Sequence, residues 1–211
     1  MKRRWIIADG GGGYSIFELM IVMAVIAIVL LITGPSMKKL IENARADEVA
    51  MGVYADFLKA KSEAIRRQND VVVIFDTQHN RYSILYDADS DWEPGQALGT
   101  GDFYLKQNVP LPADYAFAGS AFGIYGIDNE GLGVGVTFKN NVVYFQPSGR
   151  VSDDHADTID TLVKSNNRAV YIARAGDPQR NDYACIRSVV LDGLSGQPRI
   201  YKYRGTWLTR Y

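Results

Sequence analysis

Apolar positions are densest near the amino terminus of the chain. Every residue from Leu19 to Ile32 is apolar, and the segment from Tyr14 to Ile32 contains one charged residue, Glu18. A helix rises about 1.5 Å per residue, so these nineteen residues reach about 28 Å, close to the thickness of a bilayer's hydrocarbon core. Thr33-Gly34-Pro35 ends the run. The pattern predicts a helix over residues 14–35 that lies in lipid or against other apolar helices.

A helical period with a polar face follows this run. Between Ser36 and Arg67, apolar residues recur at helical spacing and charged residues fill many of the positions between them. The apolar stripe consists of Met37, Leu40, Ile41, Ala44, Ala46, Ala50, Val53, Phe57, Ala60 and Ala64. This spacing predicts an amphipathic second half of the same helix, residues 36–69, with one face packed against a core.

After Asn69 the period changes from that of a helix to that of strands. The pattern predicts strands over residues 71–75, 82–86, 103–106, 134–138, 142–145, 169–173, 184–191 and 199–203. Residues 76–80 have the composition of a hairpin turn, and glycine, proline and small residues predict loops over 87–101 and 110–133. No repeat or flexible linker divides residues 70–211, which we expect to form one β-rich globular head. The predicted fold class is α+β, a long amino-terminal helix whose second half packs on an antiparallel β-sheet.

The charge balance gives the chain no general attraction to nucleic acid or anionic lipid. Twenty-three basic and 24 acidic residues give a net charge of −1. Cys185 is the single cysteine, which excludes an intramolecular disulfide. Lys2, Arg3 and Arg4 precede the apolar run, and the positive-inside bias places this end in the cytoplasm and everything after Ile32 outside.

Glu18 requires a partner if the apolar segment lies in lipid. An ionised carboxylate within the bilayer costs about 2.5–3.5 kcal/mol on insertion scales. The glycine run Gly10 to Gly13 offers a protease an extended substrate, and a cut between Gly13 and Tyr14 would create an α-amine four residues before Glu18. In a bundle of such helices, Glu18 of one chain could neutralise the amine of the next.

These residues resemble a known signal. Gly13-Tyr14-Ser15-Ile16-Phe17-Glu18 with the following apolar run is similar to the class III signal of type IV pilins and type II secretion pseudopilins. The resemblance implies that residues 1–13 are a leader removed by prepilin peptidase after Gly13. It also implies that Tyr14, where phenylalanine is usual, becomes the N-methylated amino terminus, and that Glu18 acts in assembly.

A second resemblance indicates the subfamily. Residues 57–69, followed at once by the strand 71–75, resemble the helix-to-sheet junction of the GspH/FimT group of minor pseudopilins and pilins. The resemblance implies a pilin-like minor pseudopilin, assembled through its amino-terminal helix into the pseudopilus of a type II protein secretion system. The implied partners are other pseudopilin or pilin subunits, prepilin peptidase, the inner-membrane assembly platform and the lipid bilayer. The chain would cross the bacterial inner membrane once, with a periplasmic head, and would lie near the filament tip when assembled.

Two plainer interpretations of the amino terminus stay open. One is an ordinary secretory signal cleaved at Ala44-Arg45-Ala46, although this site lies well beyond the end of the apolar run. The other is a simple signal anchor, which explains the apolar segment but leaves Glu18 and the glycine run without a role.

The carboxy-terminal tail suggests an alternative function. From Gly193 onward there is no acidic residue, and the cations Arg199, Lys202, Arg204 and Arg210 alternate with the aromatic residues Tyr201, Tyr203, Trp207 and Tyr211. Cations and stacking rings are typical of nucleic-acid surfaces. Some FimT-like minor pilins bind DNA during uptake through a Gly-Arg-x-Arg motif, whereas Gly196-Gln197-Pro198-Arg199 lacks the first arginine. The plainer interpretation is an amphipathic last strand.

Other candidate chemistry is weak. Asp87, Asp89 and Asp91 alternate as in a calcium loop, but Trp92 and Leu98 stand where glycine and a bidentate glutamate are needed. We expect a solvated acidic loop with no metal. His79, His155 and Cys185 form no recognisable catalytic set, so we predict neither an enzyme nor a cofactor.

Overall fold

The computed structural model describes residues 14–118, 135–153, 168–176, 184–203 and 207–209, without the side chains of 31–36 and 207–209. The chain divides into two compact units, residues 1–41 and 42–211. Helix α1, Ile16–Arg67, contributes to both units and confirms the predicted long helix. It begins where the Ser15 hydroxyl accepts a hydrogen bond from the Phe17 N–H at 3.3 Å. It ends where Gln68 takes a left-handed φ of 60° and its amide donates to the Ile65 carbonyl.

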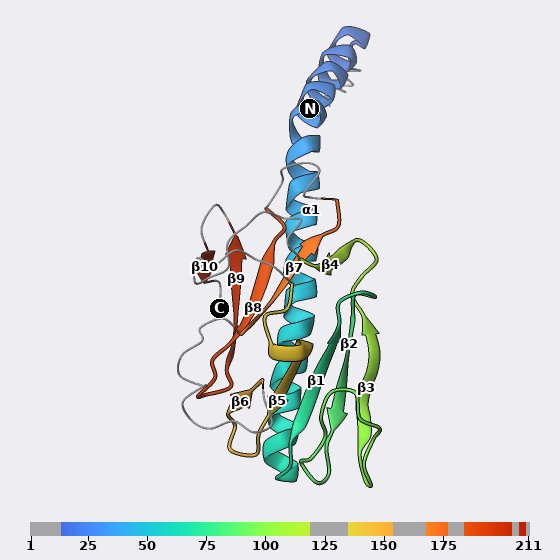
Figure 1. The fold of residues 1–211 in the computed structure, drawn as a ribbon. Coiled ribbons are helices and arrows are strands. Elements are labelled where there is room, and N and C mark those ends of the chain that lie inside the picture. The colour runs from blue at the N-terminus through green and yellow to red at the C-terminus, as the bar shows by residue number, and fades with distance from the viewer. Residues whose placement is uncertain (1–13, 119–134, 154–167, 177–183, 204–206, 210–211) are drawn as a thin grey trace, which may run out of the picture. The chain divides into compact units, whose positions relative to one another are not determined.

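The second unit, which we call the head, contains two antiparallel sheets where the sequence predicted one. Sheet A has the strand order β3-β2-β1-β5-β6 and sheet B the order β10-β9-β8-β7-β4 (Figure 1). Sheet A consists of β1 (Val71–Asp76), β2 (Arg81–Tyr86), β3 (Phe103–Pro110), β5 (Val142–Phe145) and β6 (Val151–Ser152). Sheet B consists of β4 (Tyr115–Phe117), β7 (Ala169–Arg174), β8 (Arg187–Leu191), β9 (Pro198–Tyr203) and β10 (Trp207–Thr209).

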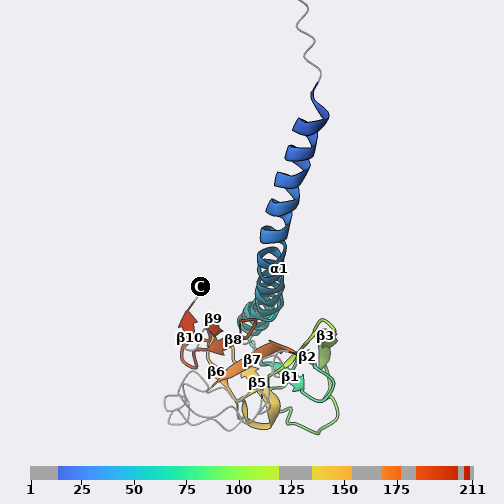
Figure 2. The ribbon, with the colours of Figure 1, turned by 90° about the horizontal axis from the view of Figure 1, so that it is seen from above.

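The part of α1 that belongs to the head packs against both sheets (Figure 2). The predicted stripe is confirmed from Ala46 onward, where its members are at most 1% exposed: Ala46, Ala50, Val53, Phe57, Ala60 and Ala64. Before Ala46 the prediction is wrong, because its members are exposed: Met37, Leu40, Ile41 and Ala44. The buried members share one apolar core with β1 and β5 of sheet A and with β7, β8 and β9 of sheet B. This burial provides most of the driving force for folding the head.

Several strand predictions are wrong in detail. The structure has β4, β6 and β10 where no strand was predicted, and β8 begins at Arg187 rather than at residue 184. The predicted strand 134–138 forms only an isolated bridge, Val136 to Val170, within the residues described. Here the Thr137 hydroxyl accepts the bond from the Ala169 N–H at 2.8 Å, so a side chain replaces a backbone carbonyl in the ladder. The turn η2, Lys139–Asn141, then starts β5 with left-handed φ at both asparagines.

The membrane-spanning character predicted for the first half of α1 is not shown. Within the residues that the structure describes, no helix has both the length and the sustained apolar character needed to cross a membrane.

Candidate assembly surfaces

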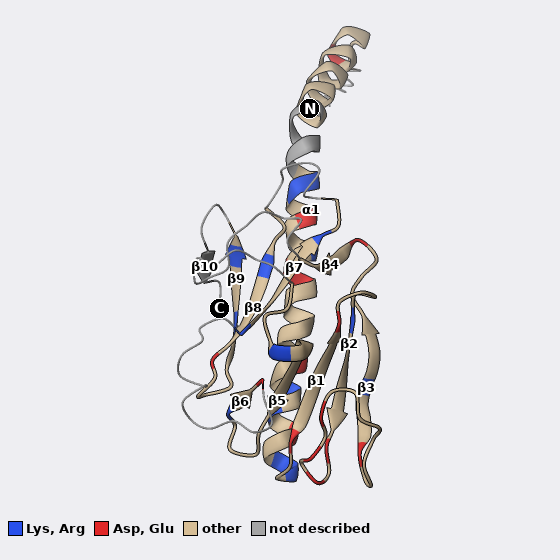
Figure 3. Ribbon diagram, in the orientation of Figure 1, with Lys and Arg blue, Asp and Glu red and all other residues tan. Residues whose placement is uncertain are grey.

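The first unit presents an uncovered apolar helix surface. From Tyr14 to Leu30, the exposed fraction of the large apolar side chains runs from 48% at Ile26 to 82% at Tyr14. Glu18, in the first turn of α1, is the single charged residue of this stretch (Figure 3). Its side chain makes no hydrogen bond or ion pair with any residue in the described part of the chain. Gly13, the predicted cleavage position, lies outside the described residues.

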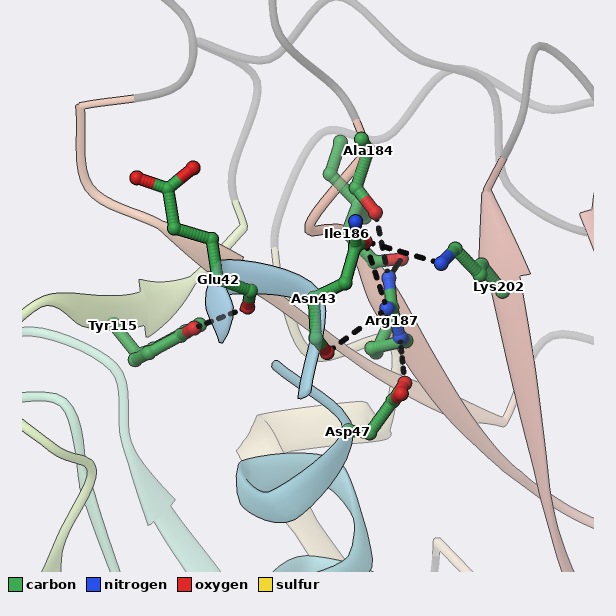
Figure 4. A network of polar contacts seen from close by, with 8 residues as sticks. All are labelled: Glu42, Asn43, Asp47, Tyr115, Ala184, Ile186, Arg187 and Lys202. Atoms are coloured by element: carbon green, nitrogen blue, oxygen red, sulfur yellow. Dashed lines mark hydrogen bonds and ion pairs between the residues drawn. The ribbon is translucent and has the colours of Figure 1, made fainter. Parts of the chain in front are cut away.

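In the head, strand β8 holds the first turns of α1 that belong to the head through a buried arginine. Arg187 is fully buried, and its Nε donates to Asp47 Oδ1 at 2.6 Å. Its Nη2 donates to the carbonyl and side-chain oxygens of Asn43, both at 3.4 Å, and its Nη1 donates to the carbonyls of Ala184 and Ile186 (Figure 4). A buried guanidinium is stable only when its charge is neutralised and its N–H groups have acceptors. Here the acceptors are oxygens of α1 and backbone carbonyls next to β8.

Three further strands of sheet B extend this contact. Lys202 of β9, which is paired with Arg187 in the strand register, donates to Asn43 Oδ1 at 3.0 Å. Arg174 of β7 forms a 2.7 Å ion pair with Glu42, whose carbonyl accepts a bond from the Tyr115 hydroxyl of β4 at 3.4 Å. We call this set the polar clamp; its members are Glu42, Asn43, Asp47, Tyr115, Arg174, Arg187 and Lys202. Sequence reasoning missed it because its partners lie far apart in the chain.

The opposite side of α1 borders a groove in the head. The groove, about 720 Å³, lies between helix residues 45–56 and residues 106–115 at the end of β3 and before β4. At one end Asp56 accepts bonds from the Tyr82 hydroxyl at 2.7 Å and from the Lys106 ammonium at 2.5 Å. Burial, with the Asp56 carboxylate beside it, raises the pKa of Tyr82, so its hydroxyl stays a proton donor.

The acidic loop after β2 differs from the predicted set. Asp87 and Asp89 bring carboxylate oxygens within 4.8 Å of one another and of Asp102, which the alternating pattern did not include. Asp91 instead lies against Asp89, and this hydrogen bond raises the pKa of Asp91. Burial raises the pKa of Asp87, whose carboxylate accepts bonds from the backbone N–H groups of Asp91 and Trp92. These two backbone hydrogen bonds to Asp87 hold the loop in its conformation.

The predicted nucleic-acid residues do not form one surface among the described residues. Arg199 is exposed on β9, while Lys202 is committed to the polar clamp. Arg204 and Arg210 lie outside the described residues. Ile200, between the cations, is buried in the core, as expected for an amphipathic strand.

Among the candidate catalytic residues, His79 is tied to Asp76 at 2.8 Å and Cys185 is buried. His155 lies outside the described residues.

In the head a helix packs on antiparallel sheets, and an exposed apolar helix segment precedes the head in the chain. These two features define the pilin-like class of α+β proteins. A family model described as type II transport protein GspH matches residues 49–176. The chain therefore belongs to the GspH family, and at family level it is a type II secretion pseudopilin, a structural component that associates with other pseudopilin subunits. No curated protein and no solved structure matches the chain.

Proposed function

We propose that this chain is a minor pseudopilin, built through the first half of α1 into the pseudopilus of a type II protein secretion system. The observation that carries the proposal is the exposed apolar surface from Tyr14 to Leu30 with Glu18 alone in it. Burying one large apolar side chain is worth about 1.5–3 kcal/mol, so this surface favours any state that covers it. Sister helices cover it in a filament, and lipid covers it before assembly.

The route into the filament begins with processing. Prepilin peptidase removes residues 1–13 after Gly13 and methylates the new amine of Tyr14. The basic leader keeps the amino terminus cytoplasmic, the apolar run Leu19 to Ile32 inserts in the inner membrane, and the head stays in the periplasm. An assembly platform in the inner membrane then passes the subunit to the filament, near its tip.

Glu18 gives the assembled helices their register. Glu18 lies in the first turn of α1, four residues after Tyr14, so its carboxylate is near enough to the processed end to pair with a neighbouring chain's new amine. In an apolar bundle an unpaired charge is strongly unfavourable, which makes the correctly paired arrangement the stable one.

The decisive experiment replaces Glu18 in the full chain in its native host. Glu18→Gln keeps the size of the side chain and removes its charge, so we expect normal membrane insertion and at least a tenfold loss of cross-linked filament subunits. Glu93→Gln, which neutralises an exposed carboxylate of the head, is the matched control and should assemble normally. Wild-type levels of incorporation for Glu18→Gln would refute the proposed role of Glu18.

Processing has its own test. Mass spectrometry of the native protein should find a methylated amino terminus at Tyr14, and Gly13→Ala should leave the leader attached. An intact leader in the wild-type protein would refute the proposal as a whole.

The alternative function is a FimT-like minor pilin that binds DNA during uptake. Its support is the exposed Arg199 and the absence of acidic residues from Gly193 onward. The affinity of the full chain for duplex DNA, measured against salt, tests it, because phosphate contacts require a steep decline with ionic strength. No binding at low salt excludes this function.

A further inference from the structure

One face of α1 carries a seven-residue repeat of apolar side chains. Alternating steps of four and three residues lead from Met37 into the head and end at Ile65. We call these positions the outer seam; its members are Met37, Ile41, Ala44, Glu48, Met51, Ala55, Leu58, Ser62 and Ile65. All of them are apolar except Glu48 and Ser62. A repeat that averages 3.5 residues is the pattern of a helix that packs along another helix.

The outer seam is open to solvent. Met37 is 64% exposed, Ile41 50%, and Met51 and Ile65 each 42%. Leu58 is half-buried, and the remaining members are exposed. The seam takes in most of the apolar residues that the sequence wrongly assigned to the face packed against the core. Apolar side chains that gather on an exposed face mark an interaction surface.

The outer seam faces away from the core of the head. Its members from Ala44 to Ser62 each lie two residues before a buried residue of α1, for example Ala44 before Ala46, Met51 before Val53 and Ala55 before Phe57. Two residues correspond to about 200° around an α-helix. The core that α1 shares with sheets A and B therefore does not cover the seam.

Lipid does not reach most of the outer seam. In the proposed topology the apolar run inserts up to Ile32, and Ile65 follows 33 residues later, about 50 Å along the helix. The headgroup layer extends only about 5–8 Å beyond the hydrocarbon core. Of the seam residues, Met37 alone lies within that distance, so the others require a protein partner.

A helix of another pseudopilin fits this surface. The proposed function covers the exposed apolar surface from Tyr14 to Leu30 with neighbouring helices, and the outer seam continues along the same helix. A subunit that enters the filament in few copies has neighbours of different sequence. Methionine adapts to irregular surfaces and alanine permits close approach, so Met37, Met51 and Ala55 suit a partner that is not a copy of this chain.

Glu48 indicates the charge of this partner. It lies in the middle of the outer seam, it is exposed, and its side chain makes no hydrogen bond or ion pair with another described residue. A carboxylate covered by a partner helix is stable only beside a cation. Glu48 and Ala55 also line the groove of the head, whose buried Leu111 and Tyr115 offer an apolar surface to the stem of a long basic side chain.

We propose that the outer seam packs along the amino-terminal helix of a different pseudopilin subunit, and that this helix has a lysine or an arginine facing Glu48. Each copy of this chain makes the contact once, so it does not repeat along the filament. This inference rests on the proposed function and extends the contact between helices from the first half of α1 into the head.

Photo-cross-linking of the full chain in membranes of the native host tests the contact. The cross-linking amino acid p-benzoylphenylalanine replaces Met51 in one chain and, as the control, Leu194 in another, because Leu194 is an exposed leucine outside α1. Mass spectrometry identifies the linked peptides. We expect at least fivefold more product from position 51, with the linked peptide in the amino-terminal helix of another pseudopilin.

Three results would overturn the proposal. One is an equal yield from positions 51 and 194. The second is a position-51 product with lipid or with proteins other than pseudopilins alone, and the third is a product only between copies of this chain.

Charge reversal tests the role of Glu48. Glu48→Lys sets two cations against each other and should lower the position-51 product at least fivefold. Replacing the partner's basic residue nearest to the cross-link by glutamate should restore the product in the presence of Glu48→Lys. Glu93→Lys, which reverses an exposed carboxylate outside the outer seam, is the matched control and should leave the yield unchanged. An unchanged yield for Glu48→Lys, or no restoration by the reversed partner, would refute the assigned partner.

The same amino acid at position 19 separates this inference from the proposed function. Leu19 is 59% exposed in the first half of α1, so its cross-links report the helix contact of the proposed filament alone. Links from position 19 to pseudopilin helices without links from position 51 would refute the outer-seam contact and leave the pseudopilin proposal standing. Absence of both kinds of link would refute both.

Discussion

Sheet A and sheet B hold the same helix by different means. Against sheet A, Phe57 of α1 packs on Phe75 and Phe145 with ring centroids 6.1 and 5.8 Å away. Against sheet B, the first turns of α1 in the head are held by the polar clamp, next to the small residues Ala46 and Ala50. Apolar packing tolerates changes of shape, whereas a buried charge network requires all of its partners. The helix is thus anchored most specifically where it enters the head.

This difference suits a subunit pulled by its helix. In the proposed filament, force on the head arrives through α1 at Glu42, the first residue of the head. The hydrogen bonds and ion pairs of the clamp are directional, so they resist sliding of the helix along sheet B, while the aromatic cluster of sheet A mainly resists separation. Sheet B therefore fixes the position of the helix along the head, and sheet A keeps the helix packed against the head.

The largest effect is expected from removing the arginine of the clamp. Arg187→Ala leaves Asp47 without its buried partner and should lower the free energy of unfolding by about 3–5 kcal/mol. Replacing both partners, as in Arg187→Met with Asp47→Leu, removes the carboxylate together with the guanidinium and should restore most of the loss. Urea unfolding of the full chain in detergent micelles measures both variants.

The matched control for this prediction is Arg81→Met, because Arg81 pairs with Asp76 at 2.8 Å in a much more exposed setting. An exposed pair contributes only about 0–1 kcal/mol. If Arg187→Ala and Arg81→Met destabilise the head equally, the polar clamp does not differ from an ordinary surface ion pair.

A smaller effect is expected on the sheet A side. Phe57→Leu keeps an apolar side chain of similar bulk in the core and should cost about 1–1.5 kcal/mol, with little dependence on salt. Arg187→Lys also keeps its charge, but it loses the planar set of donors that reaches Asp47, Asn43 and two carbonyls. In the same urea assay Arg187→Lys should be the more destabilising of the two, and the reverse order would contradict the comparison.

The sequence predicted the parts of this molecule that depend on local pattern. The stripe from Ala46 to Ala64 and the pairing of β1 with β2 follow from period and turn composition, and the structure confirms them. The short strand β4 escaped prediction because its pairing is set by a distant partner, β7. Strand β6 escaped it because two residues are too few to show a strand period. The predicted strand 134–138 failed because the Thr137 hydroxyl replaces a backbone acceptor.

The candidate site residues show the same limit. Glu18 stands out in the sequence because it is a single charge in an apolar run. Arg187 looks like an ordinary strand residue until the fold brings it to Asp47, which is 140 positions away. Likewise Asp102 joins Asp87 and Asp89 only because β2 and β3 pair, which no spacing rule for a calcium loop anticipates.

The smallest effect is expected in the acidic loop between β2 and β3 of sheet A, where carboxylates lie together, in contrast to the opposite charges that are paired in the polar clamp of sheet B. The hydrogen bond that protonated Asp91 donates to the Asp89 carboxylate, together with the neighbouring carboxylates, raises the pKa of Asp91, so the folded state binds its proton more tightly than the unfolded state does. The unfavourable contribution of Asp91 is therefore fully present above its folded pKa and fades as the pH falls through that value to the ordinary pKa of an aspartate. Asp91→Asn should raise the stability slightly at pH 7 and show no gain at pH 3, as measured by urea unfolding at both values. If Asp91→Asn raises the stability equally at both pH values, repulsion between the carboxylates is not the reason for the gain. The difference in charge between the two sheets would then be supported by the polar clamp alone.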